Sequence, residues 1–302
     1  MRQTALKTVY ELAKVDPRII FIGSDLGHGT LAEMKAELPN QFFMEGISEQ
    51  HIIGFAAGLA KQGFIPFVNT IATFFTRRAY EQIAIDLALH QSHVILLASG
   101  GGMVYAPLGP THTAIEDIST MSSIPGMQVA CPADPLEMEE IIQTTTKLSG
   151  PWYVRFGKGG EITLIDQCSE RSGNLKFFGK KESPIIIVTT GVLLHVAVEF
   201  TSRNTQYTNL ICIIHVPIID ELDSEVVMDQ IKNAKRVVVL EEHIPIGGLF
   251  TRLLHAAHRL GVDSLKFRQI SLPHQFSHHY GSQQDHFEYN KLNDSGILEC
   301  LQ

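Results

Sequence analysis

The chain contains 302 residues, of which 44% are hydrophobic and 19% are charged, and its formal net charge at pH 7 is −8. This length is about twice that of a typical domain, so a globular protein with two domains is expected. The negative charge argues against nucleic acid or an anionic membrane as a partner, and no apolar run approaches the ~20 residues that cross a bilayer. The four cysteines show neither a disulfide framework nor metal-ligand spacing, which predicts reduced thiols in a cytoplasmic protein.

Apolar runs typical of buried strands alternate with helical periodicity through the first half of the chain. Strands are expected at residues 18–23, 65–68, 93–98, 127–130 and 152–155. Helices are expected at residues 4–14, 31–38, 49–62, 75–90, 115–121 and 135–148. This alternation predicts an α/β domain with a mainly parallel sheet, which we assign to residues 1–165.

Residues 166–183 are polar and show little periodicity, so they are predicted to be a linker. A second α/β unit is expected over residues 184–302. Its strands are expected at residues 184–188, 210–214, 236–240 and near 265–270, and a helix is expected at 247–260. The predicted fold class is therefore α/β, with two three-layer domains that have mainly parallel sheets. The tail from residue 273 onward is rich in His, Gln and Asn and is expected to cover the surface.

One carboxylate opens an apolar helix made largely of small residues. The sequence ISEQH at residues 47–51, followed by GFAAGLA at 54–60, places Glu49 at the helix N-terminus, where an anion is favoured. A carboxylate that merely complements the helix dipole is the structural alternative. This segment resembles the pyrimidine-binding domain of the transketolase family of thiamine diphosphate enzymes. The resemblance implies that Glu49 contacts the aminopyrimidine ring of the cofactor and shares a proton with it.

Two further segments of the first domain resemble the cofactor-binding segments of this family. In NTIATFFTRRAYEQI, residues 69–83, Phe74 matches the family residue that stacks on the aminopyrimidine, and Arg78 matches an arginine close to the cofactor. Asp25, in the sequence SDL after a predicted strand, matches a residue that borders the cofactor pocket. Its place beyond the carboxyl end of a strand also fits the usual location of ligand sites in α/β sheets.

The expected substrate side of the site comes from other segments. His112, in the sequence GPTH at 109–112, resembles a family histidine, and an imidazole suits proton handling at the donor carbonyl because it titrates near neutral pH. Arg155 matches a family arginine that holds a substrate phosphate, and Arg2 is expected to join it at an anionic end of the substrate. In the second domain, EEH at 241–243 and GGL at 247–249 resemble a structural motif near the domain interface.

The loop before His112 departs from the family pattern. Gly100 stands where a phosphate-binding His is expected, Pro107 replaces a Glu, and Leu108 replaces the Asp that reads a sugar hydroxyl. Gly29 replaces a Ser that also contacts phosphate, with His28 beside it as a candidate replacement. An unpaired polar group on a substrate costs about 1–3 kcal/mol. The acceptor is therefore expected not to be an ordinary sugar phosphate.

The family anchors the cofactor diphosphate through a divalent metal, held by a Gly-Asp-Gly motif and a later Asn. The sequence contains no Gly-Asp-Gly. The resemblance therefore implies one half of a split enzyme, in which a separate N-terminal transketolase-type subunit holds Mg2+ or Ca2+ and no metal ligand comes from this chain. An α2β2 assembly is expected.

The implied reaction is transfer of a two-carbon ketol unit from a ketose-type donor to an aldehyde acceptor. Decarboxylation of a 2-oxo acid is an alternative that the altered loop leaves open, as in 1-deoxyxylulose-5-phosphate synthase or the beta subunits of pyruvate dehydrogenase-type enzymes. A non-catalytic partner subunit is a second alternative, although it would not need Glu49, Phe74, His112 and Arg155 together. Four histidines in the tail could suggest a metal site, but their loop-like context favours solvated surface residues: His274, His278, His279 and His286.

Overall fold

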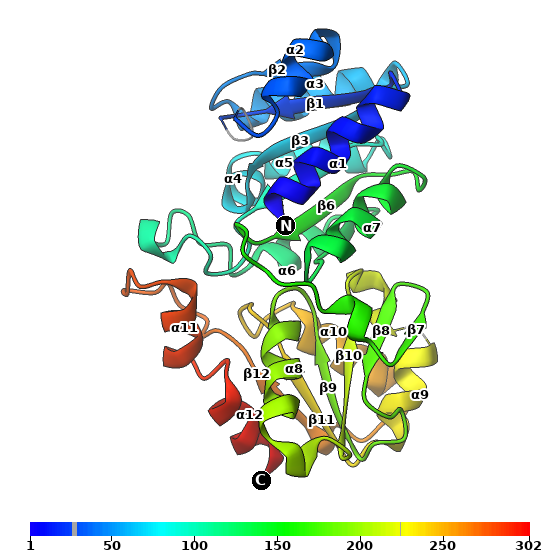
Figure 1. Cartoon of the computed structure of the whole chain (residues 1–302), viewed down its shortest axis with the longest axis vertical. Helices are drawn as coiled ribbons and strands as arrows, with labels where there is room; N and C mark the ends of the chain where they lie inside the picture. The colour runs from blue at the N-terminus through cyan, green and yellow to red at the C-terminus, as the bar shows by residue number, and fades with distance from the viewer. Residues whose placement is uncertain (26–28, 224) are drawn as a thin grey trace.

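Two six-stranded sheets, one in each half of the chain, organise the molecule (Figure 1). The computed structural model describes residues 1–25, 29–223 and 225–302. All strand pairs of the first sheet are parallel, in the order β2-β1-β3-β4-β6-β5. Its strands are β1 (Ile19–Gly23), β2 (Phe42–Met44), β3 (Ile65–Ile71), β4 (Ile95–Ser99), β5 (Gln128–Ala130) and β6 (Trp152–Phe156).

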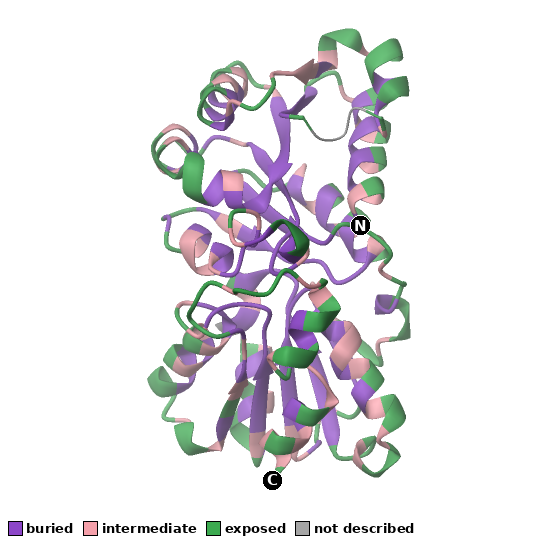
Figure 2. Ribbon diagram, turned by 90° about the vertical axis from the view of Figure 1, so that its left-hand side faces the viewer, coloured by how far each residue is buried: buried purple, intermediate pink, exposed green. Residues whose placement is uncertain are grey.

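Helices cover both faces of the first sheet, so its central strands are buried throughout (Figure 2). Helices α1 (Arg2–Val15) and α7 (Pro135–Thr145) pack on one face. The opposite face is covered by α3 (Glu49–Lys61), α4 (Ala72–Arg78), α5 (Tyr80–Gln82), a π-helical turn (Ile83–Ala88) and α6 (Asp117–Ser122), while α2 (Ala32–Glu37) lies near the sheet edge. The long helix expected at 75–90 is thus divided into shorter pieces, the first of which begins directly after β3.

The second sheet has the order β12-β11-β9-β10-β8-β7. Its four parallel strands are β9 (Ile185–Thr189), β10 (Ile211–His215), β11 (Arg236–Leu240) and β12 (Phe267–Ile270). Helices α8 (Leu193–Arg203), α9 (Glu225–Asn233) and α10 (Leu249–Arg259) connect these strands. The fold class predicted from the sequence, two α/β domains with mainly parallel sheets, is confirmed.

The segment expected to be a linker contains two strands of the second sheet. Strands β7 (Glu170–Ser172) and β8 (Leu175–Phe178) form an antiparallel hairpin, and Gly173 in its turn has a φ of +60°. The sequence did not predict these two strands, which pair with each other within the segment assigned as a linker. The reason is that β7 is a short edge strand with polar, largely exposed side chains, and such a strand lacks the apolar signal of an interior one.

The tail contains two helices that the sequence analysis did not identify. It forms α11 (Gln283–Tyr289) and α12 (Asp294–Leu301), and the side chain of Asn293 caps the second of these. Ser282 and Asp285 form a reciprocal capping box at the start of α11. His274, His278 and His279 are exposed as predicted, but His286 is only 1% exposed because it lies on the inner face of α11. The prediction that all four histidines are surface residues is wrong at this position.

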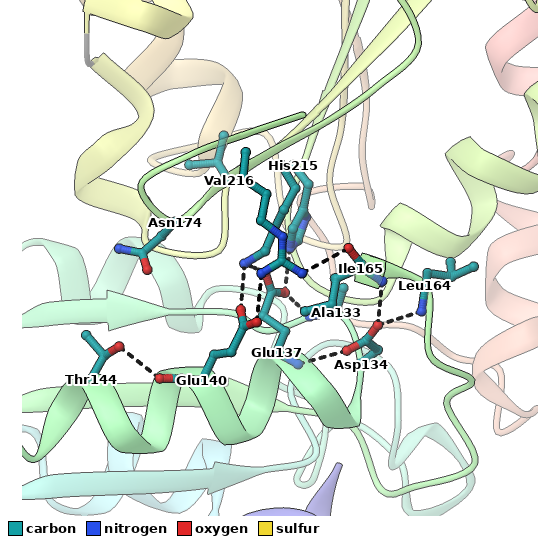
Figure 3. A network of polar contacts seen from close by, with 12 residues as sticks. Ala133, Asp134, Glu137, Glu140, Thr144, Leu164, Ile165, Asn174, His215 and Val216 are labelled. Carbon is teal, nitrogen blue, oxygen red and sulfur yellow. Dashed lines mark hydrogen bonds and ion pairs between the residues drawn. The ribbon is translucent and has the colours of Figure 1, made fainter. Parts of the chain in front are cut away.

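A buried charged network joins the two domains (Figure 3). The Glu137 carboxylate of α7 accepts a hydrogen bond from Ala133 N at 2.7 Å, and it lies 2.7 Å from His215 Nε2 and 2.6 Å from Lys176 Nζ. Burial disfavours the charged carboxylate, but His215 and Lys176 outweigh that effect and lower the pKa of Glu137 to about 2. These contacts fix the helix face of the first domain against β8 and β10 of the second.

Candidate active site

Glu49 is the first residue of α3 and only 5% exposed. The chain reaches it from the end of β2 through Gly46, whose φ of +76° is a conformation that favours glycine. The carboxylate therefore lies at the positive end of a helix and beside apolar neighbours, as the sequence predicted. The structure thus holds an anion at one defined position near the carboxyl edge of the first sheet.

Two residues of α4 belong to the same group, and one of them contacts this carboxylate. Phe74 and Arg78 are four residues apart and so share one face of the helix. Arg78 Nη1 lies 3.3 Å from Glu49 Oε1 and 3.4 Å from Oε2. The Arg78 guanidinium carbon also lies 3.7 Å from the centroid of the Phe74 ring. A planar cation thus touches both a carboxylate and an aromatic face.

His112 completes the group from a separate loop. Its ring centroid lies 5.4 Å from that of Phe74 in an edge-on arrangement, and its Nδ1 lies 2.8 Å from Thr111 Oγ1. The hydroxyl of Thr73 donates to the Thr111 carbonyl at 3.2 Å. The loop is therefore tied to the helix that carries Phe74, which fixes the imidazole beside the ring.

Arg77 fastens the same loop from the other side of α4. Its guanidinium pairs with Glu116 at 2.6 Å and donates to the carbonyls of Pro110 at 2.8 Å and Thr113 at 3.1 Å. Sequence reasoning did not identify Arg77 or Thr73 as contributors to the site. The only local signal was that both lie within the segment that carries Phe74.

Asp25 lies exposed at the carboxyl end of β1, next to the strand from which α4 emerges. The Ser24 hydroxyl donates to Asp25 Oδ1 at 3.0 Å and lies 3.0 Å from Thr70 Oγ1. Asp25 therefore belongs to the same edge of the sheet as the Glu49 group. His28, predicted to contact substrate, lies outside the described residues.

The structure places Arg155 in the domain junction. Its Nε donates to Asp117 Oδ2 at 2.9 Å, and its Nη2 donates to the Glu242 carbonyl at 2.9 Å. Burial disfavours the guanidinium charge, but Asp117 and Glu242 outweigh that effect and raise the pKa of Arg155 above its usual value. Two of its three guanidinium nitrogens are thus engaged by protein groups, and a substrate role for Arg155 stays a prediction. The same holds for Arg2, which is half-buried in the first turn of α1.

Close side-chain approaches explain the glycines in the loop after β4. A Cβ at Gly100, whose φ is +79°, would lie 2.0 Å from the Tyr105 ring. A Cβ at Gly102 would lie 2.2 Å from the Glu242 carboxyl carbon. The ring of Tyr105 therefore fills the space that a side chain at position 100 would need. This is a steric reason for the absence of the expected histidine there.

The arrangement suits the aminopyrimidine ring of the implied cofactor. A carboxylate and an aromatic face that both contact one planar group can receive a planar, protonatable ring such as an aminopyrimidine. A planar cation already makes the same two contacts in this structure. Within the described ranges, no group of three or more His, Cys, Asp or Glu side chains is arranged to hold a metal ion. The same residues contain no helix long and apolar enough to cross a membrane.

Comparisons with known proteins identify the family of the chain. The family model for the transketolase pyrimidine-binding domain matches residues 1–160, and that for the transketolase C-terminal domain matches residues 178–295. The chain therefore belongs to the transketolase family, and it contains the pyrimidine-binding and C-terminal domains in that order.

Among curated relatives, one subunit of the apulose-4-phosphate transketolase of Phocaeicola vulgatus is 28% identical, over 99% of this chain and 95% of that one. The 1-deoxy-D-xylulose-5-phosphate synthase of Heliobacterium modesticaldum is also 28% identical, over 90% of this chain but only 42% of the synthase. The chain thus spans less than half of that longer relative.

A solved structure described as a split gene transketolase, inactive beta4 tetramer, superposes on the chain with a TM-score of 0.84 and 25% identity. The match covers 100% of this chain and 96% of that one. The similarity therefore extends over both domains and over their arrangement.

Proposed function

We propose that the chain is the pyrimidine-binding subunit of a split, thiamine diphosphate-dependent transketolase-like enzyme. It would transfer a two-carbon ketol unit from a ketose-type donor to an aldehyde acceptor in carbohydrate metabolism. The observation that carries this proposal is the convergence of Glu49, Phe74, Arg78 and His112, from three separate segments, on one edge of the first sheet. The relative from Phocaeicola vulgatus, which is one subunit of a transketolase and matches nearly end to end, supports the two-chain organisation.

Each residue has a distinct task in this proposal. Bound thiamine diphosphate supplies the nucleophilic carbon and the electron sink for cleavage of a carbon–carbon bond. Glu49 holds a proton shared with the pyrimidine ring nitrogen, and Phe74 provides the surface on which that ring stacks. His112 moves or donates a proton at the donor carbonyl oxygen. Asp25 borders the pocket.

The metal and the diphosphate belong to the partner in this proposal. A separate N-terminal transketolase-type subunit with the Gly-Asp-Gly and Asn motif would hold Mg2+ or Ca2+ in an α2β2 assembly in the cytoplasm. Isothermal titration of the purified chain with thiamine diphosphate and magnesium tests this division. We expect no sub-micromolar binding by the chain alone and tight binding after the partner is added. Sub-micromolar binding by the chain alone would contradict the split arrangement.

The acceptor is proposed to be something other than an ordinary sugar phosphate. Gly100, Leu108 and Gly29 lack the polar side chains that read hydroxyl and phosphate groups in sugar-phosphate transketolases. His28, Arg155 and Arg2 remain the proposed binders of an anionic end of the substrate.

Decarboxylation of a 2-oxo acid is the second candidate reaction. The observation that favours it is the similarity to 1-deoxy-D-xylulose-5-phosphate synthases, two of which are 28% and 31% identical to this chain, against 28% for the transketolase relative. Product analysis of the reconstituted enzyme separates the two reactions. Turnover of a ketose or hydroxypyruvate supports ketol transfer, and turnover of pyruvate with release of carbon dioxide supports the synthase. No turnover with any of these donors would favour a non-catalytic partner subunit.

A further inference from the structure

The Arg78 side chain occupies the space between Glu49 and Phe74. Its guanidinium lies 3.3 and 3.4 Å from the two carboxylate oxygens of Glu49 and 3.7 Å from the Phe74 ring centroid. A ring that stacks on this face of Phe74 and hydrogen-bonds to Glu49 needs the same volume. Arg78 and such a ring therefore cannot make these contacts at the same time.

We propose that Arg78 fills the pyrimidine position in the unloaded chain and must swing out before the cofactor ring can bind. This proposal rests on the proposed function. It differs from the expectation drawn from the sequence, in which Arg78 holds the cofactor. The guanidinium is a planar cation and imitates a protonatable aminopyrimidine in both of its contacts. It thereby supplies a partner for Glu49, a 5% exposed carboxylate that would be costly to leave unpaired.

The surroundings of Arg78 permit this movement. Its side chain is 48% exposed, and it is the last residue of α4. Its contacts to Glu49 are longer than those of a tight ion pair. The neighbouring Arg77 is held differently, since it pairs with Glu116 at 2.6 Å and donates to two loop carbonyls. Arg77 is therefore fixed, whereas Arg78 is held by two contacts that a ligand can replace.

The free chain provides the first test. In an NMR spectrum of the full chain, the Arg78 Nε–H signal should show an upfield ring-current shift, because the guanidinium lies over the face of an aromatic ring. The signal is assigned by its loss in Arg78→Lys, and Phe74→Leu should remove the shift. An Arg78 signal at the position of a solvent-exposed arginine would overturn the proposal and leave the proposed function standing.

The second test measures competition directly. The full chain is titrated with the aminopyrimidine alcohol that corresponds to the ring of thiamine. We expect Arg78→Ala to bind this probe about tenfold more tightly than the wild type, because the contacts of the half-exposed Arg78 with Phe74 and Glu49 no longer have to be broken. The Arg78 signal of the wild type should move toward the solvent-exposed position during the titration. Lys61→Ala is the control, because it removes an equal charge from an exposed side chain at the far end of α3, and it should bind like the wild type.

The outcomes distinguish failure of the Arg78 proposal from failure of the proposed function. Equal or weaker binding by Arg78→Ala would show that Arg78 holds the ring instead of blocking it, and the proposed function would survive. Binding of the probe by no variant would contradict both this proposal and the pyrimidine-binding role. Arg78→Gln, which keeps a planar group without the charge, serves as the second variant if Arg78→Ala does not fold. Its affinity should lie between those of the wild type and Arg78→Ala.

Discussion

Two arginines of the first domain form ion pairs that differ in their burial and in their distance to the carboxylate. The side chain of Arg155 is 6% exposed, and its Nε contacts Asp117 at 2.9 Å. The side chain of Arg78 is 48% exposed, and its Nη1 contacts Glu49 at 3.3 Å. The first pair is enclosed between two domains, whereas the second lies at the open edge of a sheet.

The difference follows from the cost of removing a partner. A buried ion pair that loses one member leaves an uncompensated charge, so its loss is strongly destabilising. In the second pair only Glu49 is buried, so the half-exposed Arg78 can leave at small cost when a ligand takes over its contacts with this carboxylate. The junction networks around Arg155 and Glu137 are therefore suited to holding the domains together. The Glu49 and Arg78 pair is suited to exchange.

The largest effect is expected from a substitution of Glu137 in the buried junction network. Glu137→Gln should lower the free energy of unfolding by about 3–5 kcal/mol, because Lys176 and His215 would lose their buried counter-charge. Urea unfolding of the full chain measures this change. Glu140→Gln is the control on the same helix, because Glu140 is 37% exposed and contacts Lys176 at 3.2 Å. Equal effects of the two substitutions would show that burial does not govern the network.

The same carboxylate predicts an acid dependence of stability. The folded pKa of Glu137 is about 2, below its ordinary value of 4.5. The unfolded state therefore binds more protons in this range, and stability must decrease as the pH falls. The contribution of Glu137 is fully present above pH 4.5, is lost progressively toward pH 2, and amounts to roughly 3 kcal/mol. The wild type should therefore lose more stability than Glu137→Gln between pH 5 and the onset of acid unfolding. Parallel curves for the two proteins would refute this linkage.

For the pair of Glu49 and Arg78, the expected effect of a substitution is on catalytic activity. Glu49→Gln in the enzyme reconstituted with its partner should reduce kcat by at least ~100-fold, because an amide cannot share the proton with the ring nitrogen. The thermal unfolding temperature should change little, since the substitution is isosteric. Glu45→Gln is the control, because Glu45 is a nearby, partly exposed carboxylate that lies 3.6 Å from His51. Near-full turnover of Glu49→Gln would make Glu49 only a helix-end carboxylate.

The sequence predicted the elements whose signals are local. The apolar runs identified most of the buried strands, and the ISEQH segment placed Glu49 at the start of α3, where the structure has it. The cap at Ser282 and Asp285 is also a local signal, and it could have revealed α11 within the tail. Short polar strands such as β7 lack the periodicity that such predictions need.

Other features depend on residues that are distant in the sequence. Arg155 meets Asp117, 38 residues away, and the Glu242 carbonyl, 87 residues away, and no spacing rule connects these positions. The resemblance implied a substrate role for Arg155 but could not show that its Nε and Nη2 are engaged within the domain junction. Likewise, the position of Arg78 over Phe74 follows from helix geometry, but its contact with Glu49 required the fold that brings α3 and α4 together.

The smallest expected effect concerns the acceptor loop. Leu108 is 55% exposed and stands where the family places an Asp that reads a sugar hydroxyl. Leu108→Asp should therefore raise kcat/KM for ribose 5-phosphate by roughly fivefold to tenfold, since one new hydrogen bond contributes about 1 kcal/mol. Leu148→Asp is the control, because Leu148 is 48% exposed and lies outside this loop. A steady-state comparison of aldehyde acceptors with both variants measures the change. If the wild type already uses ribose 5-phosphate with a kcat/KM above ~10⁴ M⁻¹s⁻¹, in the range of ordinary enzymes, the departures in this loop do not determine the acceptor.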